Sequence, residues 1–502
     1  MKIFDRCAGA LLAVIAAGAI PAEALTVTTE AGGLREAVGD NVDVTSLVVS
    51  GNINAADFDF ISLEMKHLDN LDLSGATVVA YSGEATFNGR TASAPLTLPE
   101  GGLMSVKAAV IHLPSTLNHI EQGGLADIDA TTIVLPRYLQ SIGRSAFSNS
   151  RNLESIIIPA SVSHIGEGAF SGCTALKQVD IVGNVDTIPV SAFSGCGSLT
   201  SVSLPGGLKA IADDAFAGCK SLSTLAFPAE LASIGNRAFY GSGLQTVDLS
   251  PCRSMTEIGD WAFASAASLQ SVTLPDALVR LGKGAFFSDS SLGITQVPTT
   301  LREIDDFALS GIGSAPSDVI ASTAVERIGD YGIAGWKNVG KFVLPSNLDY
   351  MGDGAMAGWS ALQILSAESV VDVPLLGSDV WKGIDPSKVV LYVAKDLYPE
   401  YASTPQWKEF NIQAGSTGSD TPVVAPADAA VSARLEGMTL HLTATAEIAR
   451  VEIFDAAGRS FSLPSQGAGC EMAVDTSAWN SPVMIVRVVM TDGSAAAMKL
   501  SR

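Results

Sequence analysis

Apolar residues return at a nearly constant interval through the middle of the chain. The spacing between anchor positions is 22, 23 or 24 residues throughout, and most anchors are phenylalanine. A unit this short cannot bury its own apolar edge, so successive copies must stack and cover one another. The pattern predicts a solenoid of about eleven coils over residues 116–365, anchored by Leu125, Phe147, Phe170, Phe193, Phe216, Phe239, Phe263, Phe286, Leu309, Ile333 and Met356.

A single coil shows which elements to expect. Residues 201–204 alternate polar and apolar side chains, which predicts a half-buried strand. Pro205 ends that strand, because proline cannot donate to a sheet ladder. Leu208 and Ile211 predict a second short segment that faces inward. The Ala-Phe pair that follows, as at Phe216, predicts one short helical turn that places the ring in the core.

Both ends of the repeat need caps, since terminal coils otherwise expose core and sheet edge. Residues 25–115 contain degenerate repeats and are the expected N-terminal cap, while the aromatic-rich residues 366–413 are the expected C-terminal cap. Small and polar residues dominate 414–430, which is typical of a linker. Residues 431–502 alternate in short strands and predict a small β-sandwich.

The first 24 residues are organised like a secretion signal. Lys2 and Arg6 precede an apolar run over residues 8–20, which is too short to span a bilayer. Residues 22–24 read Ala-Glu-Ala, a small-x-small cleavage site. We therefore expect a signal peptide over residues 1–24, no transmembrane span in the mature chain, and export to the cell surface or beyond it.

The repeat unit I-G-x-x-A-F-x-x-C-x-x-L-x-x-V-x-L-P closely resembles the BspA-like leucine-rich repeats of bacterial surface proteins. Segments L-T-V-T-T-E-A-G-G-L and L-D-N-L-D-L-S-G-A, near the start of the mature chain, are similar to Bacteroidota members of that family. The resemblance implies a leucine-rich repeat solenoid and a cell-surface or secreted role in adhesion or host interaction. Family members are associated with binding extracellular-matrix proteins and other cells.

The last 70 residues are similar, more weakly, to the C-terminal sorting domain of the type IX secretion system. The likeness rests on V-E-I-F-D-A-A-G-R at 451–459 and M-I-V-R-V-V-M-T-D-G-S at 484–494. The segment W-N-S-P-V-M at 479–484 departs from the turn usual before that strand. The resemblance implies a sorting or anchoring domain at the outer membrane, and the departure leaves open a degenerate β-module.

Charge and motif content narrow the range of functions. The formal net charge of −22 and a pI near 4.5 oppose binding to nucleic acid and to anionic membrane surfaces. No histidine stands at metal-ligand spacing, and the motifs of catalytic or cofactor sites are missing. We expect no enzyme, no metal and no cofactor, and we interpret carboxylate pairs such as Asp213-Asp214 and Asp305-Asp306 as surface turn residues.

Two columns of the repeat invite a specific interpretation. Cys173, Cys196 and Cys219 share one repeat position, which favours a column of buried thiols over disulfides. A second column stands two residues after the inward-facing Ile. We favour caps of the short helical turn for it, with a cation-binding stripe as the alternative; its members are Glu167, Asp213, Asn236, Asp260, Asp306, Asp330 and Asp353.

The outward side of the strand row is a candidate partner-binding face, because a solenoid turns such a row into a continuous surface. It consists of Ser155, Gln178, Asp180, Ser201, Ser203, Thr224, Thr246, Asp248, Ser271 and Thr273. Trp261, Trp336 and Trp359 are a rival set of anchors. The sequence thus indicates a non-catalytic surface protein that binds a protein or glycan partner, including host extracellular matrix, with a glycan-binding or nutrient-capture protein as the alternative.

Overall fold

A computed structural model describes residues 24–86 and 89–415, together with strands between residues 431 and 501. The predicted signal peptide and linker fall almost entirely outside these residues. The chain forms two compact units. The first contains the described residues up to Tyr392 together with Glu400–Ile412, and the second contains Val393–Pro399 and the described residues from Gln413 onward.

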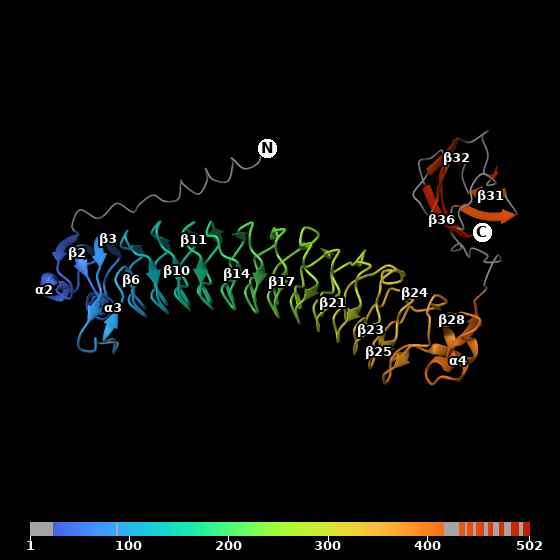
Figure 1. The fold of residues 1–502 in the computed structure, drawn as a ribbon, viewed down its shortest axis with the longest axis horizontal. Helices are drawn as coiled ribbons and strands as arrows, with labels where there is room; N and C mark the ends of the chain where they lie inside the picture. Colours follow the sequence, from blue (N-terminus) through green and yellow to red (C-terminus); the bar gives the residue numbers. More distant parts are fainter. Residues whose placement is uncertain are drawn as a thin grey trace. The chain divides into compact units, whose positions relative to one another are not determined.

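The first unit is a β-solenoid of about 17 turns, coloured blue to orange in Figure 1. This confirms the predicted solenoid class. In the first row of parallel strands, each turn pairs with the next at the repeat spacing, as in Ser155 with Gln178 and Gln178 with Ser201. The first row begins with β1 (Leu25–Thr29), β2 (Ser46–Ile53), β3 (Asn70–Val78), β7 (Val110–His112), β9 (Thr132–Val134), β11 (Ser155–Ile158), β13 (Gln178–Ile181) and β15 (Ser201–Ser203). It continues with β18 (Thr246–Asp248), β20 (Ser271–Thr273), β24 (Lys341–Val343), β26 (Ile364–Ala367), β28 (Val390–Val393) and β29 (Asn411–Ala414).

A second row of two-residue strands runs along the same coils. Its inward member is the repeated Ile, so Ile142 pairs with Ile165 and Ile211 with Ile234. The second row starts with β6 (Thr97–Leu98), β8 (His119–Ile120), β10 (Ser141–Ile142) and β12 (His164–Ile165). It goes on through β14 (Thr187–Ile188), β16 (Ala210–Ile211), β17 (Ser233–Ile234), β19 (Glu257–Ile258), β21 (Arg280–Leu281), β22 (Glu303–Ile304), β23 (Arg327–Ile328), β25 (Tyr350–Met351) and β27 (Leu375–Leu376).

The stack is longer than the eleven coils that the repeat spacing predicts, because the regions expected as caps form turns of the same kind. β1, β2 and β3 already belong to the parallel first row. In the part of the chain that the structure describes, short helices lie only in these end regions: α2 (Leu34–Val38), α3 (Ala55–Glu64), α4 (Tyr398–Ser403) and the 3₁₀ turns η1 (Pro386–Lys388) and η2 (Trp407–Glu409). A hairpin of β4 (Tyr81–Ser82) and β5 (Ala92–Ser93) completes the N-terminal part.

The Ala-Phe segment is not a helical turn, and here the sequence prediction was wrong. Two residues of each coil adopt a left-handed conformation, for example Ser145 (φ 52°) and Asn149 (φ 59°) on either side of Phe147. Such residues interrupt an α-helix. The freed N–H of Phe147 donates to the Ala169 carbonyl of the next coil at 2.7 Å, so this segment also joins neighbouring coils.

The anchor rings form a continuous column inside the solenoid. Six successive pairs from Phe147 to Phe286 stack nearly parallel, with ring centroids 5.1 to 5.4 Å apart, and all of these rings are buried. Cys173, Cys196 and Cys219 are equally buried, which confirms the thiol column. Each thiol donates to an anchor carbonyl of the preceding coil, as Cys173 does to Phe147 at 3.1 Å.

The last coils are closed by a separate aromatic cluster. Trp407 lies against Trp381, Tyr401 and Phe410, with centroid distances of 5.0, 5.1 and 6.1 Å. Its indole N–H donates to the Pro374 carbonyl at 3.0 Å. Pro374 immediately precedes β27, the last strand of the second row. The predicted C-terminal cap therefore packs against the core and also forms a hydrogen bond at the end of this sheet.

In the described residues of the second unit, seven antiparallel strands form two sheets. One sheet has the order β30-β31-β34 and the other β33-β32-β35-β36. Their bounds are β30 (Val431–Glu436), β31 (Thr439–Ala444), β32 (Ile448–Asp455), β33 (Ser460–Pro464), β34 (Glu471–Asp475), β35 (Val483–Met490) and β36 (Ala495–Ser501). The segment 479–482, where the sequence departs from the sorting-domain pattern, lies outside the described residues.

Candidate binding surfaces

Nine of the ten residues of the predicted polar face lie on strands of the first row, whereas Thr224 lies in a coil that has no strand at this position. Ser201, Ser203, Thr224, Thr246, Asp248, Ser271 and Thr273 are exposed, and Ser155, Gln178 and Asp180 are partly exposed. We refer to these ten residues as the polar face.

Strand register brings members of the polar face together in two lines. Ser155, Gln178 and Ser201 follow one another across β11, β13 and β15, and Asp180 pairs with Ser203. Farther along, β18 and β20 place Thr246 beside Ser271 and Asp248 beside Thr273. The lines offer hydroxyls and amides that donate or accept, and carboxylates that accept.

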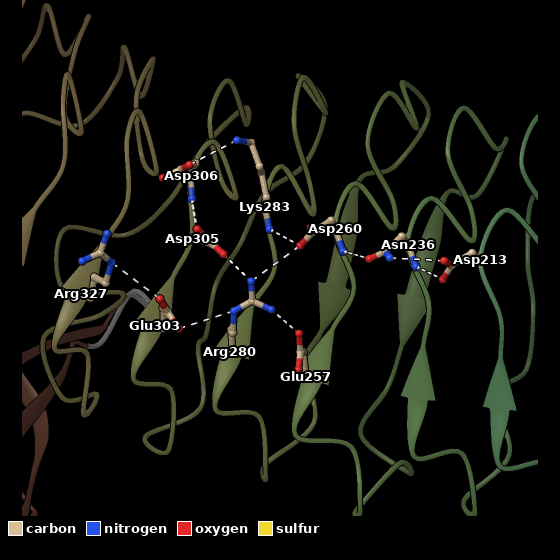
Figure 2. Close-up of polar contacts among 10 residues, drawn as sticks. All are labelled: Asp213, Asn236, Glu257, Asp260, Arg280, Lys283, Glu303, Asp305, Asp306 and Arg327. Atoms are coloured by element: carbon tan, nitrogen blue, oxygen red, sulfur yellow. Dashed lines mark hydrogen bonds and ion pairs between the residues drawn. The ribbon is translucent and has the colours of Figure 1, made fainter.

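The second row carries an alternating charge ladder that sequence reasoning missed. Glu257, Arg280, Glu303 and Arg327 occupy the outward position of four successive strands (Figure 2). Arg280 pairs with Glu257 and lies 3.5 Å from Glu303, which in turn lies 3.7 Å from Arg327. Every member immediately precedes the inward Ile or Leu, so aligned repeats would have revealed the alternation.

Arg280 is the centre of this charge ladder, since Asp260 and Asp305 also approach its guanidinium. Partial burial acts to lower the pKa of Arg280, but hydrogen bonding to Asp305 and the charges of Glu257 and Asp305 outweigh it and raise the pKa. The arginine is therefore held charged among four carboxylates, a geometry that joins neighbouring coils.

The Asp column does not cap helices, because its segment contains none, and that interpretation was wrong. Each aspartate of the column instead accepts the backbone N–H of the equivalent residue in the next coil, whereas Glu167 lies 3.9 Å from Arg144. The N–H of Asn236 donates to Asp213 at 2.7 Å, and that of Asp353 donates to Asp330 at the same distance. We call the set the Asp ladder; it comprises Asp213, Asn236, Asp260, Asp306, Asp330 and Asp353. Figure 2 shows the first four of these residues.

The glycine that precedes the N–H donor in most coils makes this close contact possible. A Cβ on Gly235 would lie 2.4 Å from the Asp213 carboxylate, and one on Gly352 would lie 2.4 Å from that of Asp330. In one coil Asp305 stands in place of this glycine. There the N–H of Asp306 donates to the Asp305 carboxylate and not to a residue of the preceding coil. Within the described residues, no group of His, Cys, Asp or Glu has the arrangement of a metal site.

Two of the three candidate tryptophan anchors are buried, so they are not available to a partner. Trp336 and Trp359 have exposed fractions of 2% and 0%. They occupy the repeat position of the cysteines, and their indole N–H groups donate to Leu309 and Ile333 carbonyls at 2.9 and 2.7 Å. Trp261 alone is partly exposed.

A buried carboxyl also occupies the cysteine position. Asp289 has an exposed fraction of 0%, and neither carboxyl oxygen has a hydrogen-bond partner among the described residues. Burial raises the pKa of Asp289 to about 8. The sequence contains the signal, because Asp289 follows Phe286 at the interval by which Cys173 follows Phe170.

The repeat itself identifies the family. A match to the BspA type leucine rich repeat region, in six copies, covers residues 103–223, 186–311 and 256–374, which together exceed half of the chain. The chain belongs to the BspA-type leucine-rich repeat family. No curated protein gives a significant match.

Several solved structures, leucine-rich repeat proteins among them, are similar to this BspA-type chain. A leucine-rich repeat protein from Bacteroides ovatus is 22% identical, with a TM-score of 0.53, over 78% of this chain and 92% of that one, which shows the shared fold. A leucine-rich cell surface protein from Faecalibacterium prausnitzii is 20% identical over 60% and 84% of the two chains, with a TM-score of 0.36. The pneumococcal vaccine antigen PcpA is 17% identical over 68% and 85%, with a TM-score of 0.34.

One further observation concerns membranes. Among the helices in the described residues, none combines the length and the apolar character needed to cross a bilayer.

Proposed function

We propose that this BspA-type protein is exported and acts at the cell surface or outside the cell as a non-catalytic binding protein. Its partner would be a macromolecule, with host extracellular-matrix proteins as the first class to test. One observation carries the proposal: the polar face presents two in-register lines of exposed or partly exposed polar residues, one across β11, β13 and β15 and the other across β18 and β20. A surface built from repeats suits an extended partner better than a small substrate.

The buried carboxyls are consistent with a binding protein. Asp57 accepts backbone N–H groups of Gly32, Leu34 and Asn54, and Asp289 lies inside the coil stack. Burial raises the pKa of Asp57 despite those three hydrogen bonds. Both groups are enclosed by the solenoid, whereas a general acid or base must reach its substrate.

A glycan-binding protein is the second candidate. Sugars stack on exposed aromatic rings, and the partly exposed Trp261 offers one. The burial of Trp336 and Trp359 removes the other two candidate platforms. We therefore place a protein partner first and a glycan partner second.

Binding is tested with the mature chain, residues 25–502, on immobilised matrix proteins and on a glycan array. Replacing Ser201, Ser203 and Thr246 with arginine places bulky charge on the polar face. The control replaces Thr187 and Ser233, exposed residues of the second row, in the same way. Loss of matrix-protein binding only in the polar-face variant supports the proposal. Binding of glycans alone, or of nothing, refutes it.

The proposed route to the surface has its own test. Residues 1–24 would direct export and residues 431–502 would direct sorting or anchoring. Fractionation of cells that express the chain with and without residues 431–502 compares surface display. Equal display of both forms would refute the sorting role and leave the binding role untouched.

A further inference from the structure

Four aromatic rings lie outside the core on the later coils. Trp261, Phe287, Phe307 and Tyr331 come from successive turns, and all four are partly exposed. Their centroids are separated by 5.5, 5.9 and 5.3 Å, the first two contacts edge-on and the third stacked. The rings therefore form one continuous line, which we call the aromatic stripe.

The stripe is placed at positions where folding does not call for aromatic residues. Trp261, Phe307 and Tyr331 have φ values of 58°, 58° and 54°, a left-handed conformation that bulky side chains rarely adopt. The equivalent residues of other coils are mostly glycine or small and polar, namely Gly123, Ser145, Gly168, Ser191, Asp214, Arg237, Gly284 and Gly354. These surface rings are kept although their backbone conformation is strained. We take this as a sign that the rings have a function other than folding.

Glycines of the following coils make room for two of these rings. A Cβ on Gly284 would lie 2.4 Å from the Trp261 ring, and one on Gly354 would lie 2.6 Å from the Tyr331 ring. Each ring thus lies against the backbone of the next coil. Its position is fixed before any partner binds, which lowers the ordering cost of association.

Carboxylates of the Asp ladder flank the stripe. Asp260, Asp306 and Asp330 immediately precede Trp261, Phe307 and Tyr331 in sequence. One oxygen of each holds a backbone N–H of the next coil, so the carboxylates are fixed as well. Among the described residues, Asp330 and the following ladder residue Asp353 take part in no ion pair.

The protein itself shows which ligand suits an outward ring. Three exposed or partly exposed tyrosines carry an arginine of the same chain over the ring, at 4.5 to 4.6 Å: Arg137 on Tyr138, Arg237 on Tyr240 and Arg327 on Tyr350. In the described part of the chain, no such cation covers the four rings of the stripe. Asp260 and Asp306 are already paired with Arg280 and Lys283, so the carboxylates available to a further cation are those of Asp330 and Asp353. Together with rings that no cation covers, these two carboxylates are complementary to positive charge.

We infer that the aromatic stripe and its flanking carboxylates bind a basic, lysine- or arginine-bearing segment of a partner protein. The inference rests on the proposed binding function and adds the chemistry of the partner. Side chains of the segment would lie over the rings of Trp261, Phe307 and Tyr331, while Asp330 and Asp353 would pair with their charges. A chain with net charge −22 attracts such a segment from a distance.

Fluorescence anisotropy with the mature chain and a labelled basic octapeptide of alternating lysine and glycine tests the inference. The same peptide with acetylated lysines is the uncharged probe. The stripe variant carries Trp261→Gly, Phe307→Gly and Tyr331→Gly, all residue changes that sister coils tolerate. The control variant carries Val134→Ser, Tyr138→Ser and Val182→Ser, which removes exposed apolar side chains elsewhere without a change in charge.

We expect the stripe variant to bind the basic peptide about tenfold or more weakly, because three cation–π contacts are lost. The control variant should match the parent, and the acetylated peptide should bind neither. Asp330→Asn keeps the ladder acceptor, as Asn236 does, and should weaken binding severalfold in a chain with unchanged urea midpoint. This second variant keeps the test decisive if the stripe variant folds poorly.

Equal binding of the basic peptide by parent and stripe variant would overturn the inference, since net charge alone would then explain the attraction. A neutral oligosaccharide that binds the parent and not the stripe variant, with no stripe-dependent binding of the peptide, would replace the basic segment with a sugar. Binding of matrix proteins that is lost in the polar-face variant and kept in the stripe variant would reject this inference alone. The proposed function would survive that result.

Discussion

Asp289 should make the stability of the solenoid depend on pH. It stands in the cysteine column, where sister coils place a thiol that donates to an anchor carbonyl. A neutral carboxyl can donate in the same way, whereas a carboxylate cannot. Desolvation by burial raises the pKa of Asp289 to about 8.

The direction in which stability changes with pH follows from the state, folded or unfolded, that keeps the proton of Asp289. The ordinary value is 3.8 and the folded value is about 8, so between them the folded chain keeps a proton that the unfolded chain has lost. The free energy of unfolding therefore falls as pH rises from about 4 to about 8 and levels off above that range. At about 1.4 kcal/mol per pH unit, the loss between pH 5 and pH 8 is at most about 4 kcal/mol.

Two substitutions remove the ionisable group while keeping the space filled. Asp289→Cys restores the column residue, and Asp289→Asn keeps the shape of the carboxyl and adds a donor. Both variants should gain stability over the parent as pH rises, with the difference largest above pH 8. Asp276→Asn, which removes an exposed carboxylate, is the matched control and should not change the profile.

The assay is urea unfolding followed by circular dichroism at several pH values between 5 and 9. Solenoids can unfold in parts, so hydrogen exchange of residues 280–295, compared between variants at the same pH, reports the local effect. Parallel pH profiles for the parent and both Asp289 variants would refute the reasoning. They would mean that the carboxyl is ionised or solvated in the folded chain.

Three further substitutions test the packing of the coils. Phe193→Ala removes a ring stacked on both sides and should cost about 3–5 kcal/mol, seen as a lower urea midpoint; a loss below 1 kcal/mol would contradict a close-packed ring column. Asp330→Ala leaves the N–H of Asp353 without its acceptor and should cost about 1 kcal/mol, whereas Asp330→Asn should cost little. Gly259→Ala would place a Cβ 2.6 Å from backbone of the preceding coil and should destabilise strongly, while Gly197→Ala meets nothing within 4 Å and should be tolerated; equal thermal midpoints for these two variants would contradict the stacking geometry.

The sequence predicts the stack well because its signals are local and repeated. Alternation at residues 201–204, proline after the strand and a ring at a constant interval each indicate one feature of the coil. The buried cysteines follow from the same periodicity. The end regions are harder to assign, because β1, β2 and β3 join the first row with repeats that have lost their anchors.

The Ala-Phe segment was misassigned because its composition suits a helix start as well as a tight turn. The residue two positions after the anchor distinguishes them, since it is often glycine, as at Gly172, Gly195 and Gly218, and has φ near 74°. The Asp column was recognised in the sequence, but its role was misassigned for a different reason. Its acceptor and donor are a full repeat apart in sequence, so the bond exists only after coils stack in register.

In a solenoid, the structural role of a residue depends on the repeat position that it occupies. Cysteine at Cys196 and tryptophan at Trp359 perform one task, donation to an anchor carbonyl, although they differ greatly in size. A residue that differs from the others at its repeat position, and does not make the contact that they make, therefore needs another explanation. Asp289 should lower the stability of the fold increasingly as pH rises from about 4 to about 8, and three residues of the aromatic stripe adopt a strained left-handed backbone conformation. In both cases the substitution that returns the column residue should stabilise the fold, and only in the stripe should it remove binding.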